Sequence, residues 1–141
     1  MRTSTLSQVF VVIFGIIITV PAAPANQIVS GTEVTGTTCT DPTAELDTHA
    51  TNVAILSICN GIAGTIQRCN GSPSSTVGAS GTSKFTLSAT EAGSGATINI
   101  SKGRWERCVW AARLSCPQGT FTSTCVGGAT RGDVRFVLEE V

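Results

Sequence analysis

The sequence predicts an α+β fold: a two-layer α/β sandwich in which two helices pack on an antiparallel sheet, held by three disulfides. Two observations predict this class. Apolar residues recur with helical spacing in two segments, 43–68 and 103–116, and with strand spacing around them. Six cysteines follow an N-terminal segment that has the features of an export signal, and cysteines of exported domains normally form disulfides.

The N-terminal segment has the three parts of a secretory signal peptide. Arg2 supplies a positive charge, an uncharged apolar run follows, and small residues precede possible cuts after Ala25 or Ala22. The apolar run is shorter than the roughly 20 residues that a membrane-spanning helix needs, so we expect no stable transmembrane anchor. We therefore expect a signal peptide over residues 1–25 and a single secreted, extracellular domain over residues 26–141.

The elements of the first half of this domain each have a local signal. A run rich in β-branched residues predicts a strand at 33–40. Asp41 followed by Pro42 is typical of a helix start, so a first helix is predicted over 43–68. The Gly/Ser-rich stretch 70–83 predicts a polar loop.

In the second half of the domain, apolar residues first alternate with polar ones and then recur with helical spacing. Alternating runs at 84–90 and 96–101, on either side of a glycine-containing turn, predict a β-hairpin. Helical spacing predicts a second helix over 103–116, and two β-runs follow at 121–126 and 133–139. We expect the two helices to lie side by side and antiparallel on one face of the sheet.

The cysteines favour disulfides over a metal site. The chain has no Cys-x-x-Cys pair, and His49 is its single histidine, so no usual zinc set is available and we expect no metal or cofactor. Antiparallel helices would bring the late part of the first helix near the early part of the second, which favours one bridge between them. The remaining pair, Cys69 with Cys116, would join helix ends that should lie far apart, so the connectivity stays open. The tentative pairs are Cys59–Cys108, Cys39–Cys125 and Cys69–Cys116.

The charge balance argues against one class of binding partner, and two short motifs indicate possible modification sites. Nine basic and nine acidic side chains balance each other without a Lys or Arg cluster, so we expect no nucleic-acid binding. Asn-x-Ser triplets begin at Asn70 and Asn99, and both are candidates for N-glycosylation in a eukaryotic secretory pathway.

No residue cluster predicts catalysis. His49 has no nucleophile or orienting group beside it in the sequence, and Glu139 with Glu140 is typical of a solvated tail. Glu106 lies among arginines of the second predicted helix, but no histidine partner is evident. We expect no enzymatic activity and assign no catalytic residue, and a small hydrolase remains the third alternative.

The two tryptophans give the best indication of a binding site. Trp105 and Trp110 would point about 140° apart on a helix, so at least one is expected in the core. The glycine-rich loops at 91–95 and 127–132 could form walls of a shallow site, although ordinary turns explain them better. The ligand-binding residues therefore remain unknown at this stage.

From Lys84 onward the chain resembles the Y3-like secreted fungal glycan-binding proteins. The resemblance rests on the run 84–90 (Lys-Phe-Thr-Leu-Ser-Ala-Thr), the helix around Cys108, and Cys116-Pro-Gln-Gly119 leading into a β-rich tail. It covers about half of the expected domain and carries over no binding residues. It implies a disulfide-containing α/β sandwich that recognises complex glycans or glycoproteins without catalysis.

The order of elements is also similar to KP6-like killer toxins and fungal effectors. Killer precursors of that kind are split at dibasic sites, and this chain has no Lys-Arg or Arg-Arg pair. The leading expectation is therefore a small, cysteine-rich, lectin-like protein. The alternative is a secreted effector or toxin-like protein that acts on another organism's protein or membrane.

Overall fold

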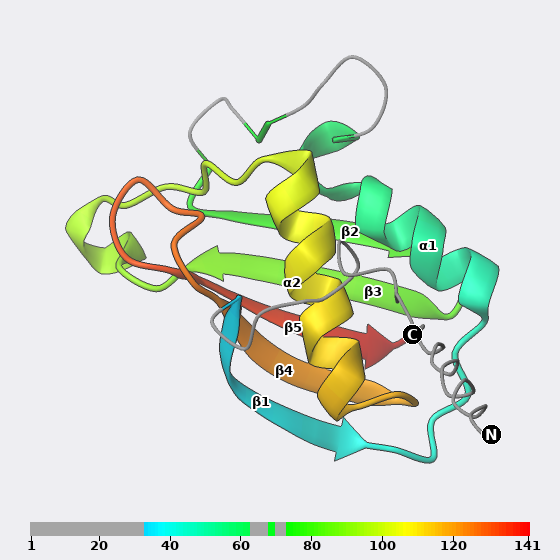
Figure 1. Cartoon of the computed structure of the whole chain (residues 1–141). Helices are drawn as coiled ribbons and strands as arrows, with labels where there is room; N and C mark the ends of the chain where they lie inside the picture. Colours follow the sequence, from blue (N-terminus) through cyan, green and yellow to red (C-terminus); the bar gives the residue numbers. More distant parts are fainter. Residues whose placement is uncertain (1–32, 63–67, 70–72) are drawn as a thin grey trace, which may run out of the picture.

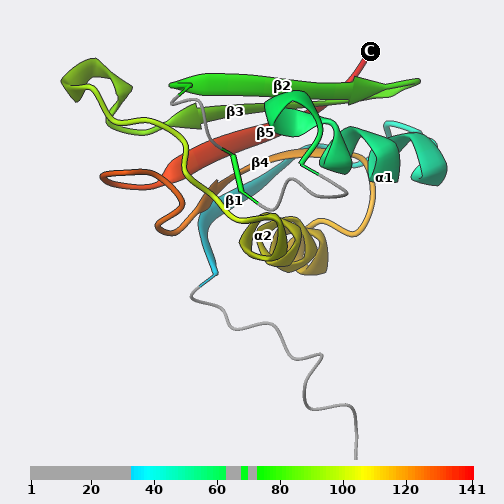
Figure 2. The same ribbon diagram turned by 90° about the horizontal axis from the view of Figure 1, so that it is seen from above.

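The computed structural model describes residues 33–62, 68–69 and 73–141, so the expected signal peptide and Asn70 lie outside the described residues. The chain forms a five-stranded antiparallel sheet with two helices on one face (Figure 1; Figure 2), which confirms the predicted α+β sandwich. The strands follow the order β1-β4-β5-β3-β2 across the sheet. The elements are β1 (Val34–Asp41), α1 (Thr48–Leu56), η3 (Ile58–Asn60), β2 (Ser75–Ser80), β3 (Ser83–Ala89), η4 (Ala92–Ser94), α2 (Lys102–Ser115), β4 (Thr120–Cys125) and β5 (Val134–Glu140).

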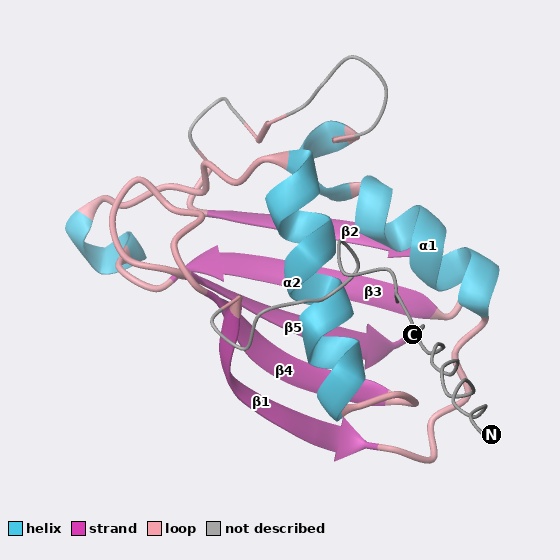
Figure 3. Cartoon of the chain, in the orientation of Figure 1, coloured by secondary structure: helices cyan, strands magenta, loops and turns pink. Residues whose placement is uncertain are grey.

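Figure 3 shows the two helices lying over the sheet. Alternating burial along the central strands creates the core between these two layers. In β3 and β5, Phe85 pairs with Leu138 and Leu87 pairs with Phe136, and all four side chains are fully buried. The residues between them, such as Thr86, point to the opposite face of the sheet because the side-chain period of a strand is two. This one-sided burial explains why segments 84–90 and 133–139 formed strands beneath the helices.

Trp105 of α2 is the centre of this core. Its ring is fully buried and makes edge contacts with Phe85 and Phe136, with ring centroids 5.3 and 5.1 Å away. Its indole N–H donates a 2.8 Å hydrogen bond to the Ile55 carbonyl oxygen, so the buried donor is satisfied. This bond places the start of α2 beside the end of α1, as the antiparallel arrangement predicted.

The first helix is shorter than predicted and begins later. The Asp47 carboxylate, rather than that of Asp41, caps it by accepting the Ala50 N–H at 2.7 Å. Asp41 ends β1, and its carboxylate accepts hydrogen bonds from the Thr43 N–H and hydroxyl instead. The helix stops at Leu56, shortly before two residues of positive φ in η3. Part of the predicted helix, residues 63–67, lies outside the described residues.

The hairpin prediction paired the wrong segments. Segment 84–90 pairs with β2, which lies inside the predicted loop 70–83, through a turn that contains Gly81 with φ +53°. Segment 96–101 forms only isolated bridges, for example between Ile98 and Ala129. The sequence of β2 is polar and contains glycine, so it lacks the alternation of apolar residues on which the prediction depended.

Glycine inside β2 has a packing reason. A Cβ atom on Gly78 would lie 2.4 Å from the Ala54 carbonyl oxygen and 2.8 Å from the Ile58 backbone nitrogen. The missing side chain therefore lets α1 and η3 approach the backbone of the edge strand directly. The residue that weakened the strand signal in the sequence is thus the one that allows the helix to cover this strand.

The three tentative disulfide pairs are wrong. Cys59 does not face α2: it lies in η3 with φ +55°, where the chain turns, and bonds to a cysteine only ten residues later. The cysteine in the middle of α2 faces the sheet and meets the end of β4, while the cysteine after α2 reaches edge strand β1. The observed pairs are Cys39–Cys116, Cys59–Cys69 and Cys108–Cys125, with Cα–Cα distances of 5.5, 5.3 and 5.5 Å.

Candidate functional site

A cleft of about 690 Å³ lies between α1 and α2 and is the candidate site. Each helix lines it with residues three, four and seven positions apart, which share one side of a helix. The loops before α1 and after α2 contribute the other lining residues. The lining residues of the helices are Thr48, Thr51, Asn52, Ile55 and Leu56 on α1, and Glu106, Val109, Trp110 and Arg113 on α2.

Apolar and polar side chains are separated within the cleft. Leu46, Ile55, Leu56 and Val109 line it and also pack on or belong to the hydrophobic core, so they form its floor. The polar lining residues Asn52, Glu45, Glu106 and Gln118 are exposed and form its rim. An apolar floor with a few polar groups around it is the usual composition of a small-molecule site.

Trp110 dominates the α2 side of the rim. Its side chain is 56% exposed, in contrast to the fully buried Trp105, which confirms that at least one of the two tryptophans belongs to the core. Leaving so large an aromatic surface in water forgoes burial worth about 2 kcal/mol. An exposed indole at the edge of a cleft is therefore available to a ligand that can stack on it.

Arg113 fixes the loop that closes one end of the cleft. Its Nη1 donates to the carbonyl oxygens of Cys116 and Gly119, at 3.1 and 2.8 Å. Its guanidinium also lies 5.2 Å from the centroid of the Phe121 ring, and burial lowers the pKa of Arg113 from its ordinary value. Arginine nevertheless stays protonated in proteins, so this residue holds the loop that presents Gln118 to the cleft.

Two carboxylates lie at the rim of the cleft. Glu106 pairs with Lys102 one turn earlier on α2, with 3.1 Å between Lys102 Nζ and Glu106 Oε2. Such an exposed pair contributes only about 0.3–0.5 kcal/mol, so it leaves Glu106 available to a ligand. Within the described residues Glu45 has no ion-pair partner. Both carboxylates can accept hydrogen bonds from hydroxyl groups.

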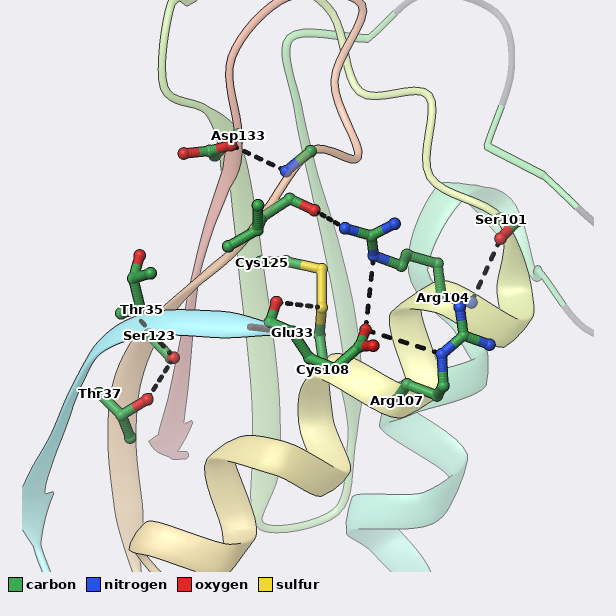
Figure 4. The surroundings of a disulfide bond; sticks show 12 residues. Glu33, Thr35, Thr37, Ser101, Arg104, Arg107, Cys108, Ser123, Cys125 and Asp133 are labelled. Carbon is green, nitrogen blue, oxygen red and sulfur yellow. Dashed lines mark hydrogen bonds and ion pairs between the residues drawn. A yellow bond between two sulfur atoms is a disulfide. The ribbon is translucent and has the colours of Figure 1, made fainter. Parts of the chain in front are cut away.

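The other arginines of α2 have a structural role on a different side of the helix. Glu33 lies between Arg104 and Arg107, and each Nε is 3.6 Å from its Oε1 (Figure 4). Arg104 also donates to the Val126 carbonyl oxygen. These contacts surround the Cys108–Cys125 disulfide and tie the start of β1 to α2 (Figure 4). They do not line the cleft.

The structure does not bring the other sequence candidates together. His49 is exposed on α1 and is not among the residues that line the cleft. Glu139 lies 3.9 Å from Lys84 across neighbouring strands, and Glu140 is exposed at the end of β5. In the part of the chain that the structure describes, no three His, Cys, Asp or Glu side chains are placed to hold a metal ion.

The two glycine-rich loops contact each other instead of the cleft. Arg131 Nε lies 3.3 Å from Glu91 Oε1, and Arg131 Nη2 donates to the Ser94 carbonyl oxygen. Thr130 receives a further hydrogen bond from the Thr97 N–H. The loops predicted as walls of a shallow site are thus joined at one end of the sheet, away from the residues that line the cleft.

Comparison with protein-family models, with curated proteins and with solved structures finds no match for this chain. Among the described residues, no helix is both long enough and apolar enough to cross a membrane. Sequence reasoning singled out Trp110 but missed the α1 side of the cleft, because only the packing of the two helices brings those residues to it.

Proposed function

We propose that this chain is a secreted, fungal-type, non-catalytic glycan-binding protein that holds an oligosaccharide in the cleft between α1 and α2. The observation that carries the proposal is the exposed indole of Trp110 beside the planar polar side chains of Asn52 and Gln118, over an apolar floor. The signal peptide expected over residues 1–25 and the three disulfides support secretion.

The rim and floor match the two kinds of surface that a sugar presents. One face of a pyranose ring carries C–H groups, which pack on an aromatic ring, while its edge carries hydroxyl groups. Amide and carboxylate groups of Asn52, Gln118, Glu45 and Glu106 offer the donors and acceptors that hydroxyl groups need. The lining of α2 from Glu106 to Arg113 spans about 10 Å at 1.5 Å per residue, which suits an oligosaccharide rather than a single sugar.

A binding role fits the carboxylates better than hydrolysis does. Glycosidases use two carboxylic groups held on opposite sides of the scissile bond, with environments that separate their pKa values. Glu45 and Glu106 are both exposed, and a lysine pairs with Glu106. We therefore assign them to hydrogen bonding with the ligand rather than to proton transfer.

The proposal is tested by a glycan array with the oxidised protein over residues 26–141, followed by titration of the best glycan. Trp110→Ala should weaken binding at least tenfold, because it removes the stacking surface without touching the core. Leu114→Ala is the matched control: Leu114 is 64% exposed one turn later on α2 but does not line the cleft. If no glycan binds at high micromolar protein, or both variants bind equally well, the proposal is wrong.

The apolar floor also favours a second candidate, an effector that binds a segment of another organism's protein. Two helices that border an apolar groove can hold an amphipathic helix of a partner. Under this alternative, Trp110→Ala would abolish binding to a target from which all glycans have been removed. Binding that disappears when the target is deglycosylated would instead support the lectin-like function.

A further inference from the structure

The triplet Asn99-Ile100-Ser101 lies in the segment that leads into α2 (Figure 1). Ile98 and Ile100 belong to the core and are each 1% exposed, whereas Asn99 between them is exposed. This alternation of burial directs the Asn99 side chain to solvent. A glycan on this carboxamide would therefore extend into solvent, and the folded domain can accommodate it.

The backbone of Asn99 is fixed while its side chain is not engaged. The Asn99 N–H donates to the Gly128 carbonyl oxygen at 2.8 Å, and its own carbonyl oxygen accepts from Arg68 Nη1 at 2.8 Å. Within the described residues its carboxamide has no hydrogen-bond partner. A group attached to that carboxamide would thus break no contact of the fold, and Asn99 does not line the cleft.

We propose that Asn99 is an N-glycosylation site that carries a glycan when the chain passes through a eukaryotic secretory pathway. The donor would be an oligosaccharide joined to a lipid through diphosphate. The Asn99 amide nitrogen forms a bond to C1 of the first sugar, the bond from C1 to the diphosphate oxygen breaks, and the lipid diphosphate leaves. The amide loses one proton to a base of the transferase.

The role of Ser101 in the folded domain indicates that the glycan is added before folding. In the folded chain its hydroxyl oxygen accepts the Arg104 N–H at 3.2 Å and caps the N-terminus of α2. A transferase must reach the whole triplet, but folding buries Ile100 and engages Ser101 in the cap. The glycan is therefore added to the chain before it folds, and Ser101 serves first as part of the acceptor triplet and then as a helix cap.

The test uses the domain over residues 26–141, secreted from yeast behind the host's own leader, so it does not depend on the signal peptide. An Asn70→Gln background leaves Asn99 as the one remaining triplet. We expect an intact mass with added hexoses, which peptide N-glycosidase removes while converting Asn99 to aspartate. Secreted, folded protein without any glycan at this position would overturn the proposal.

Two substitutions of Ser101 distinguish its role in the glycosylation triplet from its role as the N-cap of α2. Ser101→Thr retains both the triplet and a capping hydroxyl, so the glycan should remain. Ser101→Asp retains a good N-cap but destroys the triplet, so the protein should be secreted and folded without the glycan. If Ser101→Asp kept the same enzyme-sensitive mass, the modification would lie elsewhere and the assignment to Asn99 would be wrong. Glycan binding at the cleft should be unchanged in both variants.

Discussion

Removing the disulfides one at a time should destabilise the domain in an order that follows the loops they close. A bridge restricts the unfolded chain more when more residues separate its cysteines. Cys39 and Cys116 are 77 residues apart, whereas Cys59 and Cys69 are ten apart. The loop-entropy relation gives about 4.5 kcal/mol for the long bridge and about 2.8 kcal/mol for the short one. The paired Cys→Ala variants should therefore differ by about 2 kcal/mol.

Urea unfolding of the oxidised variants, analysed by linear extrapolation, measures this difference. Mass analysis of each variant should show that two disulfides remain. The Cys108–Cys125 pair closes a loop of intermediate length, since its cysteines are 17 positions apart, but both cysteines are fully buried. Its removal should add a cavity cost to the entropic cost. A larger loss from the Cys59–Cys69 pair than from the Cys39–Cys116 pair would refute this reasoning.

Three further changes test separate parts of the structure. Gly78→Ala should lower the free energy of unfolding by about 1–3 kcal/mol in a denaturant titration, because its Cβ would collide with the backbone of α1. Gly93→Ala is the control: its Cβ would meet nothing within 4 Å, so the free energy of unfolding should change by less than about 0.5 kcal/mol. Arg113→Lys should release the loop after α2 and raise the Kd for glycan several-fold with little change in melting temperature, and unchanged affinity would contradict its positioning role. Hydrogen bonds from the Thr43 hydroxyl and N–H lower the pKa of Asp41, so they stabilise the fold above the ordinary carboxyl pKa, and this stabilisation is lost as pH falls through the lowered value. Thr43→Val should therefore raise the Asp41 pKa in an NMR titration, and an unchanged pKa would show that the Thr43 hydroxyl does not lower it.

Periodicity predicted the elements whose burial is one-sided. Helix α2 and strands β4 and β5 lie where the spacing of apolar residues placed them, because each buries one face against the core. The start of α1 was misplaced since Asp41 and Asp47 are both good capping residues, and only tertiary packing selects the second. Strand β2 was missed because its residues are small and polar, and their placement depends on contact with α1.

Features that depend on contact between two distant segments were harder to predict from the sequence. The disulfide pairs follow from where η3 turns and from how β1 lies beside β4, and neither is visible in local spacing. For the candidate site, the helical angle between the tryptophans predicted that at least one of them would lie in the core; Trp105 does, and Trp110 is exposed. Asn52 and Gln118 were not singled out because they reach the rim only through the packing of α1 and the loop after α2.

The Cys39–Cys116 bridge spans most of the domain, which has a consequence for resistance to proteolysis. A single cut of the backbone anywhere between these two cysteines leaves both fragments covalently joined. The Cys108–Cys125 bridge overlaps this span and extends the same protection to the end of β4. A nicked molecule would therefore retain its sheet and both helices as one particle. It would separate into fragments on a gel only after reduction.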